Sequence, residues 1–378
     1  MRLIAGLAIA CAVAPLAVGS PLPMRPVPGE AFFGEVVALA PRMATTATVG
    51  SRGRATRVAV TARIARARLT GGPGSRNITV VMRRADGHPV ARRDTSGAYL
   101  LPRSGQVAVA GNRRWGRMQA AVQRIAGRYP GPTAIWVHDV RTGRVAAWNA
   151  DAEFPGASLV KLPLAVGAVM RMGSRPWTHP SWADVGEVLR RSSDHAANRL
   201  VNAVGSGCGG GPDAAAADGL RRLGARHSTY PGCYLVEHEL QPRLPAGGVT
   251  DVPEWSTRHT TARDMGRMLF SLQAAAVPTA AGRRNTGIDP LRARLVLGLL
   301  LTADHTGGND SLFAPGLPAG TPVAEKRGWR SGEQHGAAIA YTPRGPVIMV
   351  VLTQATGDVN PAIARAMGMD VARAVMAG

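Results

Sequence analysis

Two lysines, the only ones among 45 basic residues, stand in patterns that suit nucleophilic catalysis by serine. Arginine stays charged at any accessible pH, whereas a buried lysine can lose its proton and act as a base. The first lysine, Lys161, follows Ser158 by three residues, a spacing that places the hydroxyl and the amine on one face of a helix. Ser158 and Lys161 are therefore the predicted nucleophile and base, although a helix-capping serine beside a solvated lysine has the same spacing.

Pro163 limits where the helix after Ser158 can begin. Proline is tolerated only near a helix start, so we expect Ser158 at or just before the first turn of a helix that continues to about Met172. The hydroxyl of Ser158 then lies at the positive end of the helix dipole.

The second lysine opens the sequence Lys326-Arg327-Gly328, which we place on a β-strand at the far wall of the same site. Gly328 has no side chain, and this leaves room for a substrate backbone to approach. The backbone N–H of Trp329 is predicted to join that of Ser158 in binding the developing oxyanion. As a lone tripeptide the motif carries little information, but it contains the second of only two lysines.

A third motif, Ser193-Asp194-His195, lies between the other two in the chain. We predict that the Ser193 hydroxyl relays a proton from Lys161 or Lys326 to a departing nitrogen, while Asp194 fixes the loop through backbone hydrogen bonds. The alternative is that the serine and the aspartate only cap the helix that follows.

Glu237 and Gln241 form the fourth motif. A carboxylate beside an amide can hold and deprotonate the water that hydrolyses an acyl-enzyme. Such a pair separates a hydrolase that turns over from a protein that only becomes acylated. Glu239 competes for the role of the carboxylate, and an acidic surface loop is the alternative.

We expect three regions along the chain. Residues 1–19 combine a basic start, an apolar run and small residues at the end, which predicts a signal peptide and export; a short membrane anchor is the alternative. Residues 20–111 are rich in Pro, Gly, Ala, Thr and Arg, which indicates a poorly structured extension or a small β module, with strands only at 57–64 and 77–82. Residues 112–378 form the domain that contains the motifs.

The hydrophobic patterns within residues 112–378 predict an α/β (α+β) fold. Strands at both ends of the domain should form one antiparallel sheet flanked by helices, with an all-helical subdomain inserted between them. The predicted elements are a helix at 115–128, strands at 133–138 and 144–148, a helix at 158–172, strands at 323–328, 336–342 and 347–352, and a helix at 360–376.

No metal and no organic cofactor are expected. The chain has no C-x-x-C motif, and the His238-Glu239 pair lacks the second histidine of H-E-x-x-H. Cys208 and Cys233 remain once the leader is removed, and they either form a disulfide, with roughly 3 kcal/mol of loop-entropy stabilisation, or stay as free thiols.

The net charge of +21 raises the question of a nucleic-acid partner. The arginine-rich stretch between Pro41 and Arg103 has a single aromatic residue, Tyr99, rather than interleaved aromatics, and no helix-turn-helix or zinc-finger pattern, so we predict that there is no such partner. The charge permits association with an anionic cell envelope.

From Trp115 to Met376 the chain resembles class A serine β-lactamases and their penicillin-binding relatives. The resemblance rests on SLVK at Ser158, SDHAAN at Ser193, EHELQ at Glu237, TTARDM at Thr260 and EKRG at Glu325. It implies an antiparallel sheet and an all-helical domain with the active site in the cleft between them. For the residues, it implies acylation of Ser158 with Lys161 as partner, proton relay by Ser193, water activation by Glu237, and attraction of a substrate carboxylate by Lys326.

The chain departs from this family at three predicted substrate-binding positions. His195 stands where the family usually has Asn, and Gln241 also replaces an Asn. Arg327 replaces Thr or Ser, and its guanidinium could either bind the substrate carboxylate or obstruct it. Only 35 residues separate Ser158 from Ser193, which implies a trimmed helical domain.

Three functions remain open. The leading hypothesis is an exported, monomeric serine hydrolase of the β-lactamase type that opens β-lactam amides. The second is a D,D-peptidase or penicillin-binding protein acting on peptidoglycan stem peptides, which would deacylate slowly on β-lactams and for which Glu237 is the discriminating residue. The third is a non-catalytic scaffold of the cell envelope, in which Arg327 and His195 close the site.

Overall fold

The central sheet of the C-terminal region is assembled from two stretches of chain that are far apart in the sequence. The computed structural model describes residues 29–32, 34–69, 74–101, 112–208, 213–234, 258–276, 286–305, 310–330, 333–354 and 361–377. The sheet has the strand order β12-β13-β14-β8-β9, and every neighbouring pair is antiparallel. Its strands are β8 (Thr133–Asp139), β9 (Arg144–Trp148), β12 (Val323–Arg330), β13 (Glu333–Thr342) and β14 (Gly345–Thr353). This confirms the predicted hairpin and the three predicted C-terminal strands, and it places β12 at an edge.

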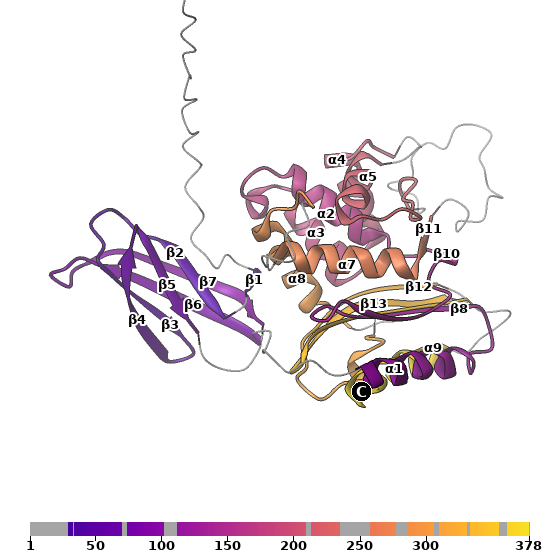
Figure 1. Cartoon of the computed structure of the whole chain (residues 1–378). Coiled ribbons are helices and arrows are strands. Elements are labelled where there is room, and N and C mark those ends of the chain that lie inside the picture. The colour runs from indigo at the N-terminus through magenta and orange to yellow at the C-terminus, as the bar shows by residue number, and fades with distance from the viewer. Residues whose placement is uncertain are drawn as a thin grey trace, which may run out of the picture.

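Helices cover both faces of this sheet (Figure 1). α1 (Asn112–Ala126) and α9 (Pro361–Ala377) pack on one face around an apolar cluster. The opposite face carries the helical subdomain, which contains α2 (Lys161–Arg171), α3 (Trp182–Arg190), α4 (Asp194–Val204), α5 (Ala214–Leu223), α7 (Ala262–Ala276) and α8 (Pro290–Leu301). The short strands β10 (Glu153–Pro155) and β11 (His259–Thr261) pair beside it. The structure therefore confirms an antiparallel sheet flanked by helices with an inserted helical subdomain. None of the described helices is both long and apolar enough to cross a membrane.

α2 is the central helix of the subdomain, and nine of its residues are buried. It packs closely against α5 because two glycines face each other across the contact. A Cβ on Gly167 would lie 1.7 Å from the carbonyl oxygen of Ala215, and one on Gly219 would lie 1.8 Å from that of Pro163. Without these glycines the helices could not approach so closely, and α2 could not hold its first turn in its present position.

The N-terminal region is more ordered than its composition predicts. Residues 31–100 form a seven-stranded sheet with the order β1-β7-β6-β3-β4-β5-β2, in which only the β1–β7 pair is parallel. Its strands are β1 (Ala31–Phe32), β2 (Glu35–Leu39), β3 (Thr46–Ser51), β4 (Arg54–Thr61), β5 (Ile64–Arg68), β6 (Gly74–Arg83) and β7 (Pro89–Leu100). The expectation of two strands was wrong, and the predicted strand at 57–64 contains a turn at Ala62 and Arg63. Both residues have positive φ, and they separate β4 from β5.

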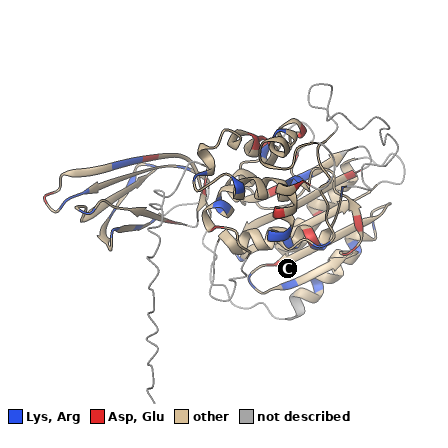
Figure 2. Ribbon diagram, turned by 90° about the horizontal axis from the view of Figure 1, so that it is seen from above, with Lys and Arg blue, Asp and Glu red and all other residues tan. Residues whose placement is uncertain are grey.

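Many inward-facing positions of this β module are alanine, so its strands lack the strong apolar alternation that marks a strand in sequence. Ten of its arginines are exposed, against three exposed acidic residues, and the basic residues lie on several strands (Figure 2). The module packs on α8, where Arg294 Nε donates to Glu30 Oε1 at 2.7 Å and both side chains are largely buried. A Cβ on Gly298 would lie 2.0 Å from the carbonyl oxygen of Gly29, so the two parts meet closely.

Candidate active site

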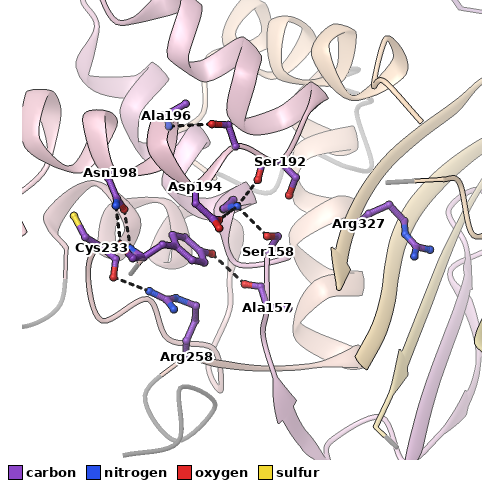
Figure 3. A network of polar contacts seen from close by, with 12 residues as sticks. Ala157, Ser158, Ser192, Asp194, Ala196, Asn198, Cys233, Arg258 and Arg327 are labelled. Atoms are coloured by element: carbon purple, nitrogen blue, oxygen red, sulfur yellow. Dashed lines mark hydrogen bonds and ion pairs between the residues drawn. The ribbon is translucent and has the colours of Figure 1, made fainter. Parts of the chain in front are cut away.

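Ser158 lies in the turn between β10 and α2, ahead of the first helical residue. Lys161 begins α2, and its amine donates a hydrogen bond to Ser158 Oγ at 2.9 Å (Figure 3). Ser158 is partly exposed, whereas the side chain of Lys161 is fully buried. The structure thus brings together the hydroxyl and the amine that their spacing paired, and it leaves the hydroxyl accessible.

The ammonium group of Lys161 contacts several other groups. It donates to the carbonyl oxygen of Ser192 and forms an ion pair with Asp194 Oδ1. The ring of Tyr234 lies under it, with its centroid 4.4 Å from Nζ. A buried ammonium without such partners would be strongly destabilising, so the carboxylate of Asp194 allows a charged lysine to occupy this position.

Lys326 approaches the site from β12, on the other side of Ser192. Its Nζ donates to Ser192 Oγ and to the carbonyl oxygen of Arg327, at 2.7 Å each. Burial lowers the pKa of Lys326 well below its ordinary value, and the nearby charge of Lys161 lowers it further. Of its two protonation states, the neutral amine is therefore favoured more strongly than in an ordinary lysine.

The hydroxyl that meets Lys326 belongs to Ser192 and not, as the motif predicted, to Ser193. Ser193 Oγ instead accepts a hydrogen bond from Ala196 N at 3.1 Å and caps α4. The contact between serine and lysine thus lies one residue earlier in the chain than predicted. The capping alternative is therefore confirmed for Ser193. A serine directly before a helix can accept hydrogen bonds from the free N–H groups of the first turn.

The same one-residue shift changes which side chain stands third in the motif. Asp194, and not His195, faces Lys161, and the expected backbone hydrogen bonds of Asp194 are replaced by this ion pair. His195 is exposed on α4, and within the described structure it makes no hydrogen bond or ion pair with the residues around Ser158. A carboxylate therefore occupies the position for which the resemblance implied an uncharged amide.

Two residues around the site hold left-handed backbone conformations without being glycine. The φ angle is 42° at Ala157, directly before Ser158, and 61° at Ser192. Such conformations cost free energy and persist where the surroundings enforce them. At Ala157 one enforcing contact is the hydroxyl of Tyr234, which donates to its carbonyl oxygen at 3.0 Å.

Arg327 does not reach the space around Ser158. Successive residues of a strand point to opposite faces, so the side chain of Arg327 leaves β12 on the face away from Lys326 and points away from Ser158 (Figure 3). It is buried at 1% exposure and donates to Gln334 Oε1 at 2.8 Å. The prediction that its guanidinium binds or obstructs a substrate carboxylate is therefore wrong.

Gly328 lies where β12 passes close to Ser158. A Cβ there would lie 3.1 Å from Ser158 N and 3.0 Å from Leu159 N, so the glycine makes room for the backbone of the nucleophile itself. The next residue, Trp329, has a 45% exposed side chain. The position of Ser158 N beside this strand suits the predicted pairing of Ser158 N–H with Trp329 N–H around an oxyanion.

The segment that ends at Tyr234 is fixed by several contacts, of which only the disulfide was among the alternatives that the sequence offered. The side-chain amide of Asn198 accepts from Tyr234 N at 2.7 Å and donates to Tyr234 O at 2.8 Å. Cys233, the preceding residue, forms a disulfide with Cys208, and their Cα atoms are 5.3 Å apart. Arg258 stacks on the ring of Tyr234 at 3.9 Å. These contacts hold the tyrosine ring against Lys161.

Glu237 and Gln241, together with the competing Glu239, lie outside the described residues. In the described structure the ionisable side chains that meet around Ser158 are those of Lys161, Lys326 and Asp194. With the hydroxyl of Ser192 they can move protons to and from a serine nucleophile. Among the same residues, no group of three His, Cys, Asp or Glu side chains is placed to hold a metal ion.

Solved structures with similar folds include β-lactamases. An ancestral class A β-lactamase aligns with a TM-score of 0.51 and 21% identity over 69% of this chain and 99% of its own. A β-lactamase from Desulfarculus baarsii aligns with a TM-score of 0.50 and 21% identity over 70% of this chain and 99% of its own. At this identity, the likeness supports the fold.

Sequence comparison identifies relatives over the same region. A β-lactamase from Streptomyces fradiae is 28% identical over 256 residues, which are 64% of this chain and 79% of the relative. One from Streptomyces albus G is 27% identical over 258 residues, or 64% and 77% of the two chains. The model of the beta-lactamase enzyme family matches residues 117–176 and 184–377, which is more than half of the chain. The chain therefore belongs to the beta-lactamase enzyme family.

Proposed function

We propose that this protein is a serine hydrolase that opens β-lactam amides through an acyl-Ser158 intermediate. The observation that carries the proposal is the hydrogen bond of 2.9 Å between Lys161 Nζ and Ser158 Oγ, made by a fully buried lysine to a partly exposed serine. A nucleophile with a base within hydrogen-bond reach, itself oriented by a third group, is the usual arrangement of an activated serine. Here the third group is Asp194.

Acylation requires the proton of Ser158 to leave as its oxygen attacks. As the bond from Oγ to the carbonyl carbon forms, Lys161 can accept that proton if it passes one of its own to Asp194, which it already contacts. The carbonyl oxygen gains negative charge, and the backbone N–H groups of Ser158 and Trp329 are the donors that we assign to it.

Breaking the amide bond requires a proton at the departing nitrogen. Ser192 Oγ is the hydroxyl placed to supply it, because Lys326 can replace that proton across their hydrogen bond of 2.7 Å. When Lys326 is protonated, it also provides a positive charge for a substrate carboxylate. Its lowered pKa favours release of the proton through Ser192.

Hydrolysis of the acyl-enzyme requires a water molecule and a base. Glu237, assisted by Gln241, remains the predicted base. A penicillin-binding protein or D,D-peptidase that deacylates slowly on β-lactams is the second function. Glu237 is the residue that separates the two functions, because only the hydrolase needs a base for the deacylating water.

A chromogenic cephalosporin tests both functions on the purified protein and its Ser158→Ala variant, with colour release and intact mass followed together. Steady colour release that the variant lacks supports the hydrolase. A stable adduct on Ser158 without turnover supports the penicillin-binding function. The absence of both signals would refute both functions and favour the non-catalytic scaffold. Glu237→Gln then tests deacylation, because it should turn steady release into accumulation of the adduct.

We also propose export and association with an anionic cell envelope. The support is the apolar leader at residues 1–19 and the exposed arginines of the β module. Fractionation of cells that produce the full chain, washed at low and at high salt, tests both proposals. Release by salt alone would indicate electrostatic association with the envelope, and recovery in the cytosol would contradict export.

A further inference from the structure

We propose that the carboxylate of Asp194 is a binding subsite for a primary ammonium group on the acyl side of the substrate. The inference rests on the serine-hydrolase function proposed above. It adds a substrate class, namely amides and lactams whose acyl portion carries a positively charged amine.

The first observation is the position of the two oxygens of Asp194. Oδ1 pairs with Lys161 Nζ, which in turn donates to Ser158 Oγ, so the carboxylate is separated from the nucleophile by one ammonium group. The side chain of Asp194 is 42% exposed, whereas that of Lys161 is fully buried. In the described structure no second hydrogen bond reaches Asp194, so Oδ2 is open to a ligand.

The second observation is the direction in which the side chains leave this turn. Ser192 Oγ accepts a hydrogen bond from Lys326 on β12, while Asp194 pairs with Lys161 on α2. A departing nitrogen that takes its proton from Ser192 must lie toward β12. The acyl portion, attached to the other side of the same carbonyl carbon, then extends toward Asp194.

The charge of Asp194 decides which acyl groups are accepted. A carboxylate can only accept hydrogen bonds, so an acyl group that offers only acceptors would remove water from Oδ2 and leave it without a partner. An ammonium group replaces that water with a charge-assisted hydrogen bond. The positive charge of Lys161 opposes this binding in part, but it lies behind the carboxylate and is already paired with it. Because the carboxylate is half exposed, we expect an advantage of about fivefold for the ammonium compound.

The experiment compares benzylpenicillin with ampicillin, which differs from it by one amino group on the acyl side chain. The second-order rate of acylation of Ser158 is measured for each compound by competition with a chromogenic cephalosporin. The wild-type protein should prefer ampicillin about fivefold, and the preference should fall as salt is added. In Asp194→Asn, which keeps an oxygen for Lys161, the ratio should fall to about one or below.

Asp184→Asn is the matched control. Asp184 lies on α3 and binds Arg199 at 2.7 Å, so the variant removes the same charge from the same subdomain without touching Ser158 or Lys161. It should keep the wild-type ratio. The subsite would be overturned if the ratio of the acylation rates for ampicillin and benzylpenicillin were the same in wild type and Asp194→Asn. It would also be overturned if this ratio fell equally in Asp194→Asn and Asp184→Asn. Thermal unfolding checks that each variant is folded.

A second measurement keeps the two proposals separate. Calorimetry on Ser158→Ala, with and without Asp194→Asn, gives the non-covalent affinity for both compounds even where acylation is lost. If neither compound acylates the wild-type protein but Ser158→Ala still binds ampicillin more tightly through Asp194, the proposed function fails and the subsite stands. If Ser158→Ala binds both compounds equally, the subsite fails whatever the acylation rates are.

Discussion

Removing the hydroxyl of Ser192 and removing that of Ser193 will change the rate of acylation by very different factors. Ser192 Oγ accepts a hydrogen bond of 2.7 Å from Lys326 and is the hydroxyl that we propose as proton donor to the leaving group. Ser193 Oγ accepts one of 3.1 Å from Ala196 N and caps α4. Ser192→Ala should therefore slow acylation strongly, and Ser193→Ala should act on stability.

The magnitudes follow from the two kinds of contact. Loss of a positioned proton donor costs about 100-fold to 10,000-fold in rate, so Ser192→Ala should lose at least about 100-fold. Loss of a serine N-cap costs about 1 kcal/mol, which in a domain of this size lowers the melting temperature by about 3 °C. Ser193→Ala should keep the rate of acylation within about threefold of wild type.

Acyl-enzyme formation measured by stopped-flow and intact mass, together with thermal unfolding, tests the pair. Ser193→Asp is the control, because aspartate also caps helices and should restore the melting temperature that Ser193→Ala loses. The reasoning fails if Ser193→Ala loses 100-fold in acylation while Ser192→Ala stays near wild type, since that result would assign the proton relay to Ser193.

Three further changes test the stability of the parts that position the site. Replacing Cys208 and Cys233 with serine should lower the free energy of unfolding by about 3 to 4 kcal/mol, because the unfolded chain gains the entropy of the loop that the disulfide closes. Denaturant titration measures this loss of stability. Lys326→Met should raise stability most at low pH, because the pKa of Lys326 is lower in the folded protein than in the unfolded chain. The cost of burying this lysine therefore shrinks as pH rises toward the ordinary lysine pKa. Unfolding at several pH values measures the difference in stability between the variant and wild type. Gly167→Ala should cost at least about 3 kcal/mol, since its Cβ would lie 1.7 Å from Ala215 O and force α2 away from α5, a loss that thermal unfolding would report.

Each of these changes has an outcome that contradicts its reasoning. For the disulfide, it is a native protein whose stability does not change when reductant exposes two thiols. For Lys326→Met, it is a stability difference from wild type that stays constant between neutral pH and pH values near the ordinary lysine pKa. For Gly167→Ala, it is an unchanged melting temperature, and Gly116→Ala, on α1, is the control for a glycine at an ordinary helical φ whose added Cβ meets nothing.

The elements of the C-terminal domain could be predicted because each has a local cause. The strands at 133–138 and 347–352 are runs of apolar and β-branched residues, and Pro163 restricts the start of α2. The β module could not be predicted in the same way. Half of its buried apolar positions are alanine, and only pairing between distant strands, such as β1 with β7, makes a sheet of them.

The sequence by itself determined that the hydroxyl of Ser158 and the amine of Lys161 meet. Ser158 and Lys161 are three residues apart at a helix start, so local geometry alone brings them together. The scarcity of lysine likewise singled out Lys326, although 165 residues separate it from Lys161. The composition of the chain therefore already indicates that the two lysines belong to one site.

Only the tertiary structure decided which residue of the Ser192-Ser193-Asp194 run does what. Either serine can cap a helix or carry a hydroxyl to a lysine, and the choice depends on where β12 passes, 134 residues further along the chain. The same packing turns Arg327 to the far face of the sheet and sets Tyr234 and Asp194 against Lys161. Contacts across such separations depend on how helices and strands pack in three dimensions, and a local pattern carries no record of that.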